Sequence, residues 1–279
     1  MTGRPDGGRG LLLVAGTLLV DEVLTLRRPP AAGTQQRAVA RRVSGGGQVW
    51  HTARAAAVAG ADVAVTGHRG DDAEGAELAR RLTALGVRDA LVAVGRSRRA
   101  VVLDSPPHER AIVSLPEEAA DALPPLKDED LLARVGWVHL DGYGLDARCG
   151  RLLLSLASWA DARGVPVSLE PPSLAGLAAR RERLPSLPRL SLLSGRPEEV
   201  SAVLPLLAAS PRVVVEHDGP RPVTWSGHAG SLRLPVPRHD DIDTLGAGDR
   251  FTGGLLAAVL RGADPAAALR AGIEAAGLP

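Results

Sequence analysis

The chain alternates short apolar runs with amphipathic segments, and no other feature of the sequence limits its possible folds as strongly. Runs such as Leu11–Leu19, Asp62–Thr66 and Trp137–Leu140 have the length and apolar content of buried strands. Between such runs, apolar residues recur at helical spacing, as in the Ala73–Leu85 segment that Gly86 ends. Further strands are predicted at 91–94, 165–169, 190–193 and 212–215, and further helices at 51–59, 147–163 and 197–208. This alternation predicts an α/β fold with a mostly parallel central sheet, covered by helices on both faces.

Two pairs of half-polar strands break this alternation, because no helix separates the members of either pair. They occupy about residues 22–43 and 97–116, and each pair turns at a proline-containing segment. We expect them to form a small antiparallel β lid, inserted into a single domain over residues 11–279 that follows a flexible tail over residues 1–10. Such a sheet has unpaired edges, so a homodimer that covers the lid is a further expectation.

Composition excludes several function classes. The chain has 279 residues, 45% of them hydrophobic, which is enough for a buried core and excludes a disordered chain. A formal charge of +1 gives no electrostatic reason to expect a nucleic acid partner, and 2% aromatic residues argue against a base-stacking platform. Lys127 is the only lysine and follows no glycine loop, which excludes a Walker A phosphate site.

The cysteine content and the N-terminal apolar run predict a cytoplasmic protein with no membrane partner. Cys149 is the only cysteine, so an internal disulfide is impossible and a reducing compartment is expected. The apolar run Leu11–Val20 is too short to span a bilayer, and it leads directly into Asp21 and Glu22.

The segment Asp243–Asp249 (DTLGAGD) is the strongest chemical signal, because its glycines stand at the start of a helix predicted from about Gly248 to Gly262. Glycines at such a position let the backbone approach a ligand, and the free N–H groups of the first turn bind anions such as phosphate. Asp249 would lie in that turn, where a carboxylate can take the proton of an attacking hydroxyl group. The Gly253-Gly254 pair would let the helix pack closely. The alternative is that the glycines only form a turn and Asp249 only complements the helix dipole.

Together with the residues after it, this segment (DTLGAGD-x-F-x-x-G) resembles the C-terminal signature of the ribokinase/PfkB carbohydrate kinases. The N-terminal half is similar to the same family, because Gly46-Gly47 opens a helix that leads into AAAVAGADVAVTGHRGDDAEG. The segments VGWVHLDGYGL, GVPVSLEPP and LLSGRPEEV follow in the family's order, so the resemblance extends from Leu11 to Leu256. It implies a ribokinase-like α/β domain with a β lid, in a kinase that uses ATP and Mg²⁺ to phosphorylate a hydroxyl group of a monosaccharide or nucleoside. A monovalent cation such as K⁺ is a further cofactor candidate.

Carried onto this chain, the resemblance implies a role for each residue that matches the family's motifs. Asp249 would be the general base, and the anion hole would consist of Gly246, Ala247 and Gly248. The acceptor would be bound by Asp21, Gly46, Gly47 and His51, the nucleotide by Thr244, Gly246, Gly248 and Gly219, and the metal by Glu198 and Asp243. Asp21 also closes the predicted first strand, and the carboxyl end of a parallel strand is where open α/β sheets bind ligands.

The chain departs from the family at three positions, and these leave a second function open. His51 stands where the family usually has an asparagine that binds the acceptor, which predicts an altered acceptor pocket. Gly195 replaces the asparagine of the N-x-x-E magnesium motif and leaves only Glu198, and Glu170 replaces a common aspartate. With the short segment after the last helix, these departures favour the alternative of a catalytically weak member that binds a sugar or nucleotide as a regulatory protein.

An oxidoreductase that binds a dinucleotide is a third class, and the sequence disfavours it. The G-x-G-x-x-G motif of such enzymes should follow the first strand. At that position, residues 14–19, the chain reads VAGTLL.

Overall fold

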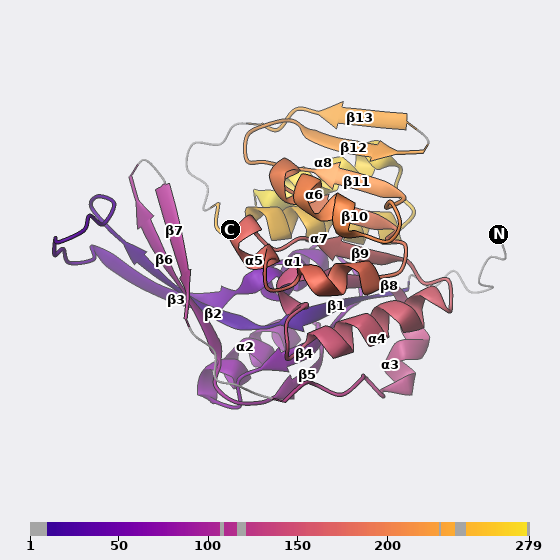
Figure 1. Ribbon diagram of the computed structural model, residues 1–279, viewed down its shortest axis with the longest axis horizontal. Coiled ribbons are helices and arrows are strands. Elements are labelled where there is room, and N and C mark those ends of the chain that lie inside the picture. The colour runs from indigo at the N-terminus through magenta and orange to yellow at the C-terminus, as the bar shows by residue number, and fades with distance from the viewer. Residues whose placement is uncertain (1–9, 107–108, 116–120, 229, 238–243, 278–279) are drawn as a thin grey trace.

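The computed structural model describes residues 10–106, 109–115, 121–228, 230–237 and 244–277. Residues 1–9 of the predicted flexible tail lie outside this range. Within it, the chain forms a nine-stranded sheet with helices on both faces and a separate four-stranded sheet that projects to one side (left in Figure 1). The predicted fold class is therefore confirmed.

The large sheet is mostly parallel and has the strand order β13-β12-β11-β10-β9-β8-β1-β4-β5. Its strands are β1 (Leu11–Thr17), β4 (Val63–Arg69), β5 (Arg88–Ala93), β8 (Val135–Asp141), β9 (Val167–Glu170), β10 (Leu192–Gly195), β11 (Val213–Glu216), β12 (Val223–Gly227) and β13 (Gly230–Leu234). From β11 to β5 every pairing is parallel, whereas β12 and β13 add antiparallel pairs that the sequence did not predict. These last strands are half-exposed and short, so they lack the continuous apolar run by which the others were found.

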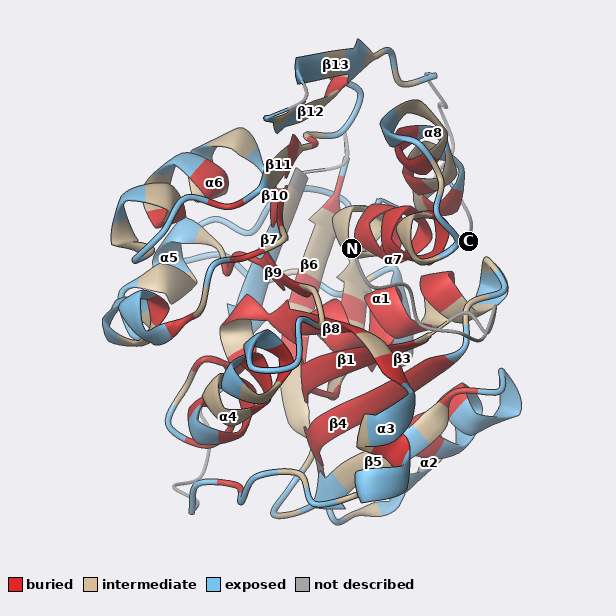
Figure 2. Ribbon diagram, turned by 90° about the vertical axis from the view of Figure 1, so that its right-hand side faces the viewer, coloured by how far each residue is buried: buried red, intermediate tan, exposed pale blue. Residues whose placement is uncertain are grey.

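Two hydrophobic clusters hold the helices to the two faces of this sheet. One face carries α1 (Gly47–Val58), α2 (Ala73–Ala84), α7 (Ala247–Leu260) and α8 (Pro265–Ala276). The other carries α3 (Glu129–Arg134), α4 (Gly150–Asp161), α5 (Leu174–Leu177) and α6 (Pro197–Val203), with the short 3-10 helices η1 (Gly142–Gly144), η2 (Arg181–Ser186) and η3 (Leu204–Leu206) at the strand ends and between helices. Strand β1 contributes side chains to both clusters. Leu11 and Leu13 point to the face that carries α4, whereas Leu12 and Val14 point to the face that carries α1. Figure 2 shows β1 and β4 as buried strands between the two helical layers.

The small sheet consists of β2 (Leu19–Thr25), β3 (Ala40–Gly46), β6 (Arg98–Ser105) and β7 (Glu109–Ser114), in the order β3-β2-β6-β7. Strands β2 and β3 pair antiparallel, as do β6 and β7, in agreement with the two predicted strand pairs. The two pairs join through β2 and β6, which run parallel. The small sheet therefore has one parallel pairing at its centre and two antiparallel pairings at its edges.

The predicted position of Asp21 at the end of the first parallel strand is wrong. Strand β1 ends at Thr17, and the backbone N–H of Leu18 still donates to the carbonyl of His68 in β4 (3.0 Å). The chain then enters the small sheet, where Asp21 is the third residue of β2. The apolar run from Leu11 to Val20 is buried except for the half-buried Leu19, so hydrophobicity alone does not show where the strand changes sheets.

Ion pairs fix the small sheet internally and at its base. Glu22 of β2 accepts hydrogen bonds from Arg41 of β3 (2.6 Å) and Arg99 of β6 (3.1 Å). At the base, Arg98 donates to Asp146 (2.7 Å) and to the hydroxyl of Thr17 (3.2 Å), which ties the start of β6 to the end of β1.

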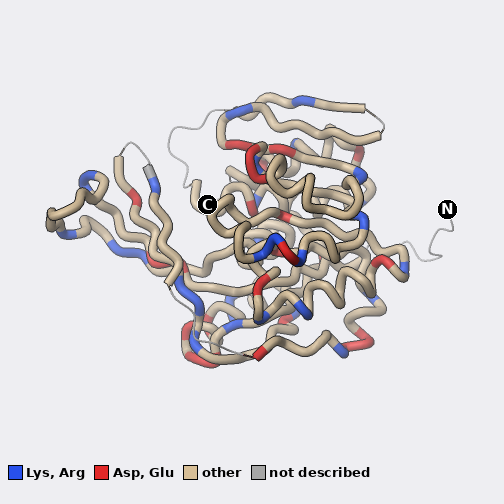
Figure 3. Tube along the Cα trace, viewed as in Figure 1, with Lys and Arg blue, Asp and Glu red and all other residues tan. Residues whose placement is uncertain are grey.

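Figure 3 shows basic and acidic residues interspersed over the chain, with basic positions on the small sheet. Among the described helices, none has both the length and the apolar character needed to cross a membrane.

A buried histidine in β8 makes the stability of the fold depend on pH. His139 is fully buried, its Nδ1 lies 2.9 Å from the hydroxyl of Ser168, and burial lowers its pKa to about 3. The unfolded chain binds this proton at a pKa of about 6.5, so the folded state loses stability as the pH falls below that value. We expect His139 to contribute a loss of up to about 1.4 kcal/mol per pH unit between pH 6 and 4.

Urea unfolding at pH 7, 6 and 5 of the parent and of His139→Asn measures this contribution. The variant keeps a polar group near Ser168 but has no titrating ring. Its free energy of unfolding should fall less steeply with decreasing pH than that of the parent. Equal slopes for the two proteins would show that His139 contributes nothing to the acid sensitivity.

Candidate active site

The carboxyl ends of the parallel strands bring polar residues to one edge of the large sheet. Asp141 ends β8, Glu170 ends β9, Gly195 ends β10 and Glu216 ends β11. The first turn of α7 lies at the same edge, because the Cα of Gly248 is close to the carboxyl group of Glu170. The carboxyl edge of a parallel sheet is the usual place for ligands in open α/β folds.

The DTLGAGD loop leads into α7 as predicted, with the helix beginning at Ala247, one residue before the predicted start. Gly246 precedes it in the left-handed conformation (φ +69°), and no side chain caps the helix. The backbone N–H groups of a first helical turn have no partner within the helix, so this turn can bind an anion. Asp249 lies in the same turn.

Arg250 and two glycines hold this turn in place. The buried Arg250 guanidinium donates to the carbonyl of Leu245 (2.6 Å) and to that of Ala276 at the end of α8 (3.0 Å). Gly253 lies directly against α1 and Gly254 against α8, where a side chain at either position would overlap the neighbouring helix. The predicted close packing through the glycine pair is confirmed.

Two carboxyl groups meet beside the first turn of α7. Glu170 is 5% exposed, and burial together with the charge of Asp249 raises its pKa well above the usual range. Burial also raises the pKa of Asp249, a residue that is half-buried as a whole and whose carboxyl group lies within hydrogen-bonding reach of Glu170. The hydrogen bond between them is best satisfied when Glu170 holds a proton, which leaves Asp249 as the carboxylate of the pair.

The four residues predicted to bind the acceptor lie together at the base of the small sheet. Gly46 packs its Cα against the carboxylate of Asp21, and Gly47 begins α1 with φ +81°. One turn into α1, the ring of His51 lies against Gly246, and its Nε2 is 3.7 Å from Oδ2 of Asp21. Neither ring nitrogen of His51 has a hydrogen-bond partner within the described structure, although the side chain is only 10% exposed. His51 therefore borders the predicted anion hole directly, and Asp21 lies next to His51.

Two further predicted site residues, Glu198 and Gly219, lie in the segments that follow strands β10 and β11. Glu198 is exposed and pairs with Arg196 (3.5 Å), whereas Glu199, its neighbour in α6, is half-buried. Burial raises the pKa of Glu199 to about 7, and the charge of Asp249 acts in the same direction. Gly219 lies in the turn between β11 and β12 with open space around it.

Two predicted residues stand at the start of the loop before α7. Asp243 lies outside the described residues. Thr244 is exposed, and its hydroxyl accepts a hydrogen bond from Arg110 of β7 (2.8 Å), so that the small sheet touches this loop. The side chain of Arg110 also pairs with Asp104 of β6 (3.1 Å).

Two residues around this turn, Glu170 and His217, have no role among the predictions, although Glu170 was noted as the replacement of a common aspartate. Glu199, whose pKa responds to the charge of Asp249, was not predicted either. Glu170 and His217 each end or directly follow a strand that the sequence did predict, which is the signal that could have found them. His217 is buried, its ring packs against that of Phe251 at 4.8 Å, and burial lowers its pKa to about 4.

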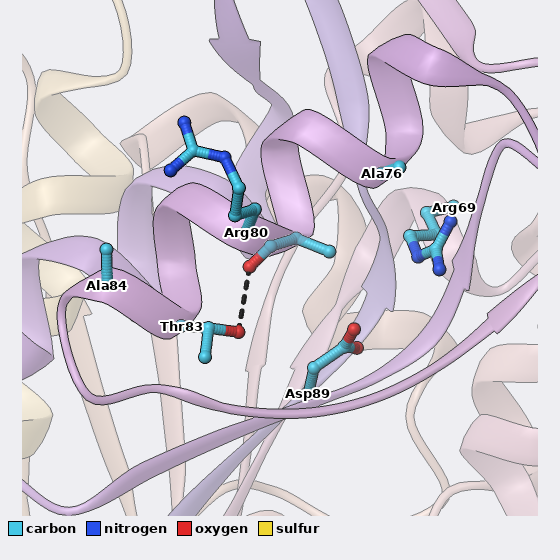
Figure 4. A pocket seen from close by; sticks show the side chains of 7 residues that line it. Arg69, Ala76, Arg80, Thr83, Ala84 and Asp89 are labelled. Carbon is cyan, nitrogen blue, oxygen red and sulfur yellow. Dashed lines mark hydrogen bonds between the residues drawn. The ribbon is translucent and has the colours of Figure 1, made fainter.

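One cavity of the described structure lies away from this turn, and no preformed metal cage accompanies it among the described residues. The described residues contain no group of three or more His, Cys, Asp or Glu side chains placed to hold a metal ion. A shallow cavity of about 480 Å³ lies between α2 and strands β4 and β5, lined by Arg69, Ala76, Ala79, Arg80, Thr83, Ala84 and Asp89 (Figure 4). None of these residues belongs to the predicted site, and the hydroxyl of Thr83 is bonded within its own helix, to the carbonyl of Ala79 (3.0 Å).

The family follows from the whole chain together with this site. A profile of the pfkB family carbohydrate kinases matches residues 11–278, which include both the Gly46-Gly47 helix start and the DTLGAGD loop. The chain belongs to the pfkB family of carbohydrate kinases. Family membership confirms the predicted enzyme class, a phosphotransferase with a hydroxyl group as acceptor.

Individual relatives agree with this membership. The ribokinase of Bacillus subtilis (strain 168) is 25% identical over 283 residues, covering 96% of this chain and 92% of that protein. Among solved structures, adenosine kinase from Sinorhizobium meliloti superposes with a TM-score of 0.83 at 19% identity, covering 97% of this chain and 93% of that one. Ribokinase from Cryptococcus neoformans var. grubii serotype A, in complex with ADP, gives 0.76 at 19% identity, covering 96% and 92%. These structures confirm the ribokinase-like fold.

Proposed function

We propose that this pfkB family member transfers the γ-phosphoryl group of ATP to a hydroxyl group of a monosaccharide or nucleoside. The observation that carries the proposal is the position of Asp249, a half-buried residue in the first turn of α7, a helix start that no side chain caps. On the proposed acceptor side stand Asp21 and His51, which lie 3.7 Å apart, and the ring of His51 lies against Gly246. The ADP bound to the Cryptococcus ribokinase supports the choice of ATP as donor.

In the proposed reaction, Asp21 accepts hydrogen bonds from hydroxyl groups of the acceptor while Gly46 and Gly47 leave room for it to approach the backbone. Asp249 takes the proton of the attacking hydroxyl group. The hydroxyl oxygen forms a bond to the γ-phosphorus as the bond to the bridging oxygen breaks, and ADP leaves with that electron pair. The backbone N–H groups at Gly246–Gly248 stabilise the charge on the phosphoryl oxygens during transfer.

Magnesium would be held on the side of α6. Mg²⁺ binds through one or two carboxylates together with the phosphates of its substrate, so it does not need a cage of protein ligands. The half-buried carboxylate of Glu199, whose pKa responds to the charge of Asp249, has the required chemistry and fits this role better than the exposed Glu198. When bound, the ion would neutralise phosphate charge. A requirement for K⁺ stays a prediction.

The proposed partners are small molecules and a second copy of the chain. Strands β3 and β7 form the edges of the small sheet, and Val43 and Val113 are 40% and 50% exposed on one of its faces. Apolar side chains beside open edges favour the predicted homodimer. The role of the small sheet as a lid is supported by the contact from Arg110 to Thr244.

A substrate panel tests the proposed function. ADP release would be measured with Mg²⁺ and ATP over monosaccharides and nucleosides, in parallel with the rise in melting temperature that each compound causes. We expect turnover with at least one class of acceptor, and the same compound should raise the melting temperature. Ligand-induced stabilisation without turnover across the panel would instead support the regulatory alternative, for which the replacement of the family's asparagine by His51 is the specific observation.

A further inference from the structure

The cavity beside α2 lies outside the proposed active site, and the proposed reaction uses none of its lining residues. It has a volume of about 480 Å³ and lies between α2 and the strands β4 and β5. Two charged side chains line it from the strands: Arg69 is the last residue of β4, and Asp89 is the second residue of β5 (Figure 4). The cavity therefore brings a cation and an anion together at a place where catalysis does not account for them.

Helix α2 lines the same cavity mainly with small side chains. Ala76, Ala79 and Thr83 follow one another at helical spacing, so they lie on one side of the helix, and Ala84 extends this side by one residue. A methyl group fills little of the space between a helix and a neighbouring strand, which leaves the cavity open. Thr83 donates its hydroxyl to the carbonyl of Ala79 (3.0 Å). The alanines therefore give the cavity an apolar wall.

The charges of Arg69 and Asp89 are not neutralised by the protein. Within the described residues, neither side chain forms an ion pair. Nη1 of the half-buried Arg69 donates to the carbonyl of Gly70 (3.1 Å), which is a neutral group, and its Nε is buried without a partner among the described residues. Oδ1 of the exposed Asp89 accepts only the backbone N–H of Leu91 (2.9 Å). Both charged groups therefore retain the capacity to bind a ligand of opposite charge.

A third charged residue of the cavity, Arg80, differs from these two. Its Nε and Nη2 donate to the carboxylate of Glu77 one turn earlier in α2 (2.7 and 2.9 Å), so its charge is already paired. The cavity thus presents one unpaired cation and one unpaired anion beside an apolar wall.

We propose that this cavity binds a small zwitterion of the α-amino acid type, with its carboxylate at Arg69, its ammonium group at Asp89 and its side chain against the alanines of α2. A simple anion would be repelled by Asp89 and a simple cation by Arg69, whereas a zwitterion presents the opposite charge to both groups. Cavities of this volume commonly bind small organic molecules. The inference does not depend on the proposed function, because none of these residues takes part in phosphoryl transfer.

An NMR titration of the full chain tests the proposal with three related probes. L-Leucine carries both charges, L-leucinol lacks the carboxylate, and N-acetyl-L-leucine lacks the ammonium group. We expect L-leucine to shift the backbone amide signals of α2 and β5, and the other two compounds to bind about 10-fold more weakly, because each loses one hydrogen-bonded charge pair.

Three variants assign the two charges to their residues. Arg69→Gln and Asp89→Asn each remove one unpaired charge, and asparagine keeps the oxygen that accepts the N–H of Leu91. Both variants should bind L-leucine about 10-fold more weakly than the parent. The matched control is Arg80→Gln, which removes a charge of the same cavity that Glu77 already neutralises, and it should retain the parental affinity.

Several results would overturn the proposal. These are the absence of α2 and β5 signal shifts with L-leucine, equal binding of L-leucinol or N-acetyl-L-leucine, and parental affinity in Arg69→Gln or Asp89→Asn. An equal loss in Arg80→Gln would also overturn it, because the net charge of the surface would then explain the binding. The comparison of the three probes uses the parent protein, so it does not depend on how well the variants fold. None of these measurements uses turnover, so failure of the proposed kinase reaction would leave their outcome unchanged.

Discussion

Replacing Asp249 with asparagine is expected to lower the rate of phosphoryl transfer by ~10²–10⁴-fold while ligand binding survives. Asparagine keeps the shape of the side chain but cannot take a proton from the acceptor hydroxyl. The backbone N–H groups at the start of α7 do not depend on that side chain, so the anion hole should persist. Single-turnover measurements with saturating MgATP, together with calorimetric binding of nucleotide and acceptor, separate the two effects.

The matched control for this variant is Asp264→Asn, the same chemical change at the next helix. The carboxylate of Asp264 accepts a hydrogen bond from the N–H of Ala267 (2.8 Å) and caps α8 on the surface. The Asp264→Asn substitution should lower the free energy of unfolding by about 1 kcal/mol or less and leave turnover near the parental level. Turnover in Asp249→Asn that equals this control would refute the role of Asp249 as general base.

The carboxyl group of Glu170 offers a second check on the same role. It lies within reach of Asp249, and burial favours its protonated form. If Glu170 supplies the residual activity of Asp249→Asn, adding Glu170→Gln should lower that activity further. If the residual rate comes only from binding and the anion hole, the double variant should react as slowly as the single one.

Long elements with strong periodicity were predictable from the sequence, and the change of sheet after β1 was not. Strands β1, β4 and β8 are buried on both faces, and their continuous apolar runs identify them without reference to the rest of the fold. The predicted position of Asp21 was wrong because Val20 and Val23, in the small sheet, are buried like the residues of β1. Burial in either sheet produces the same apolar pattern in the sequence. Only the pairing of β2 with β3 and β6 shows that β2 belongs to the small sheet.

The site was predictable where a backbone shape demands particular residues. The glycines before α7 and the Gly46-Gly47 start of α1 are such positions, since a side chain at Gly46 or Gly246 would collide with Asp21 or His51. Glu170 and His217 impose no such pattern, and their importance comes from strands that lie far apart in the chain. The sequence does not distinguish Glu198 from Glu199 for a related reason, because the turn of α6 that exposes Glu198 and half-buries Glu199 depends on its tertiary contacts.

Replacing Gly246 with alanine is expected to reduce the rate of phosphoryl transfer by about 10²–10³-fold, a loss comparable with that of one donor in an anion hole. Two causes act together. The left-handed conformation at φ +69° costs a residue with a side chain about 1–2 kcal/mol, and the new methyl group would overlap the imidazole of His51. Relief of that overlap must move either the loop, and with it the N–H groups of Ala247 and Gly248, or the ring beside Asp21.

Gly262→Ala separates conformational strain from the loss of the site, because it lies at the other end of the same helix. Its φ of +78° imposes a similar backbone cost, but no atom lies within 4 Å of the added methyl group. Both variants should therefore melt at lower temperatures than the parent, whereas only Gly246→Ala should lose phosphoryl transfer and affinity for MgATP. If Gly262→Ala loses as much activity at an equal fall in melting temperature, strain in α7 would explain both losses. The anion hole at Gly246 would then have no support from this experiment.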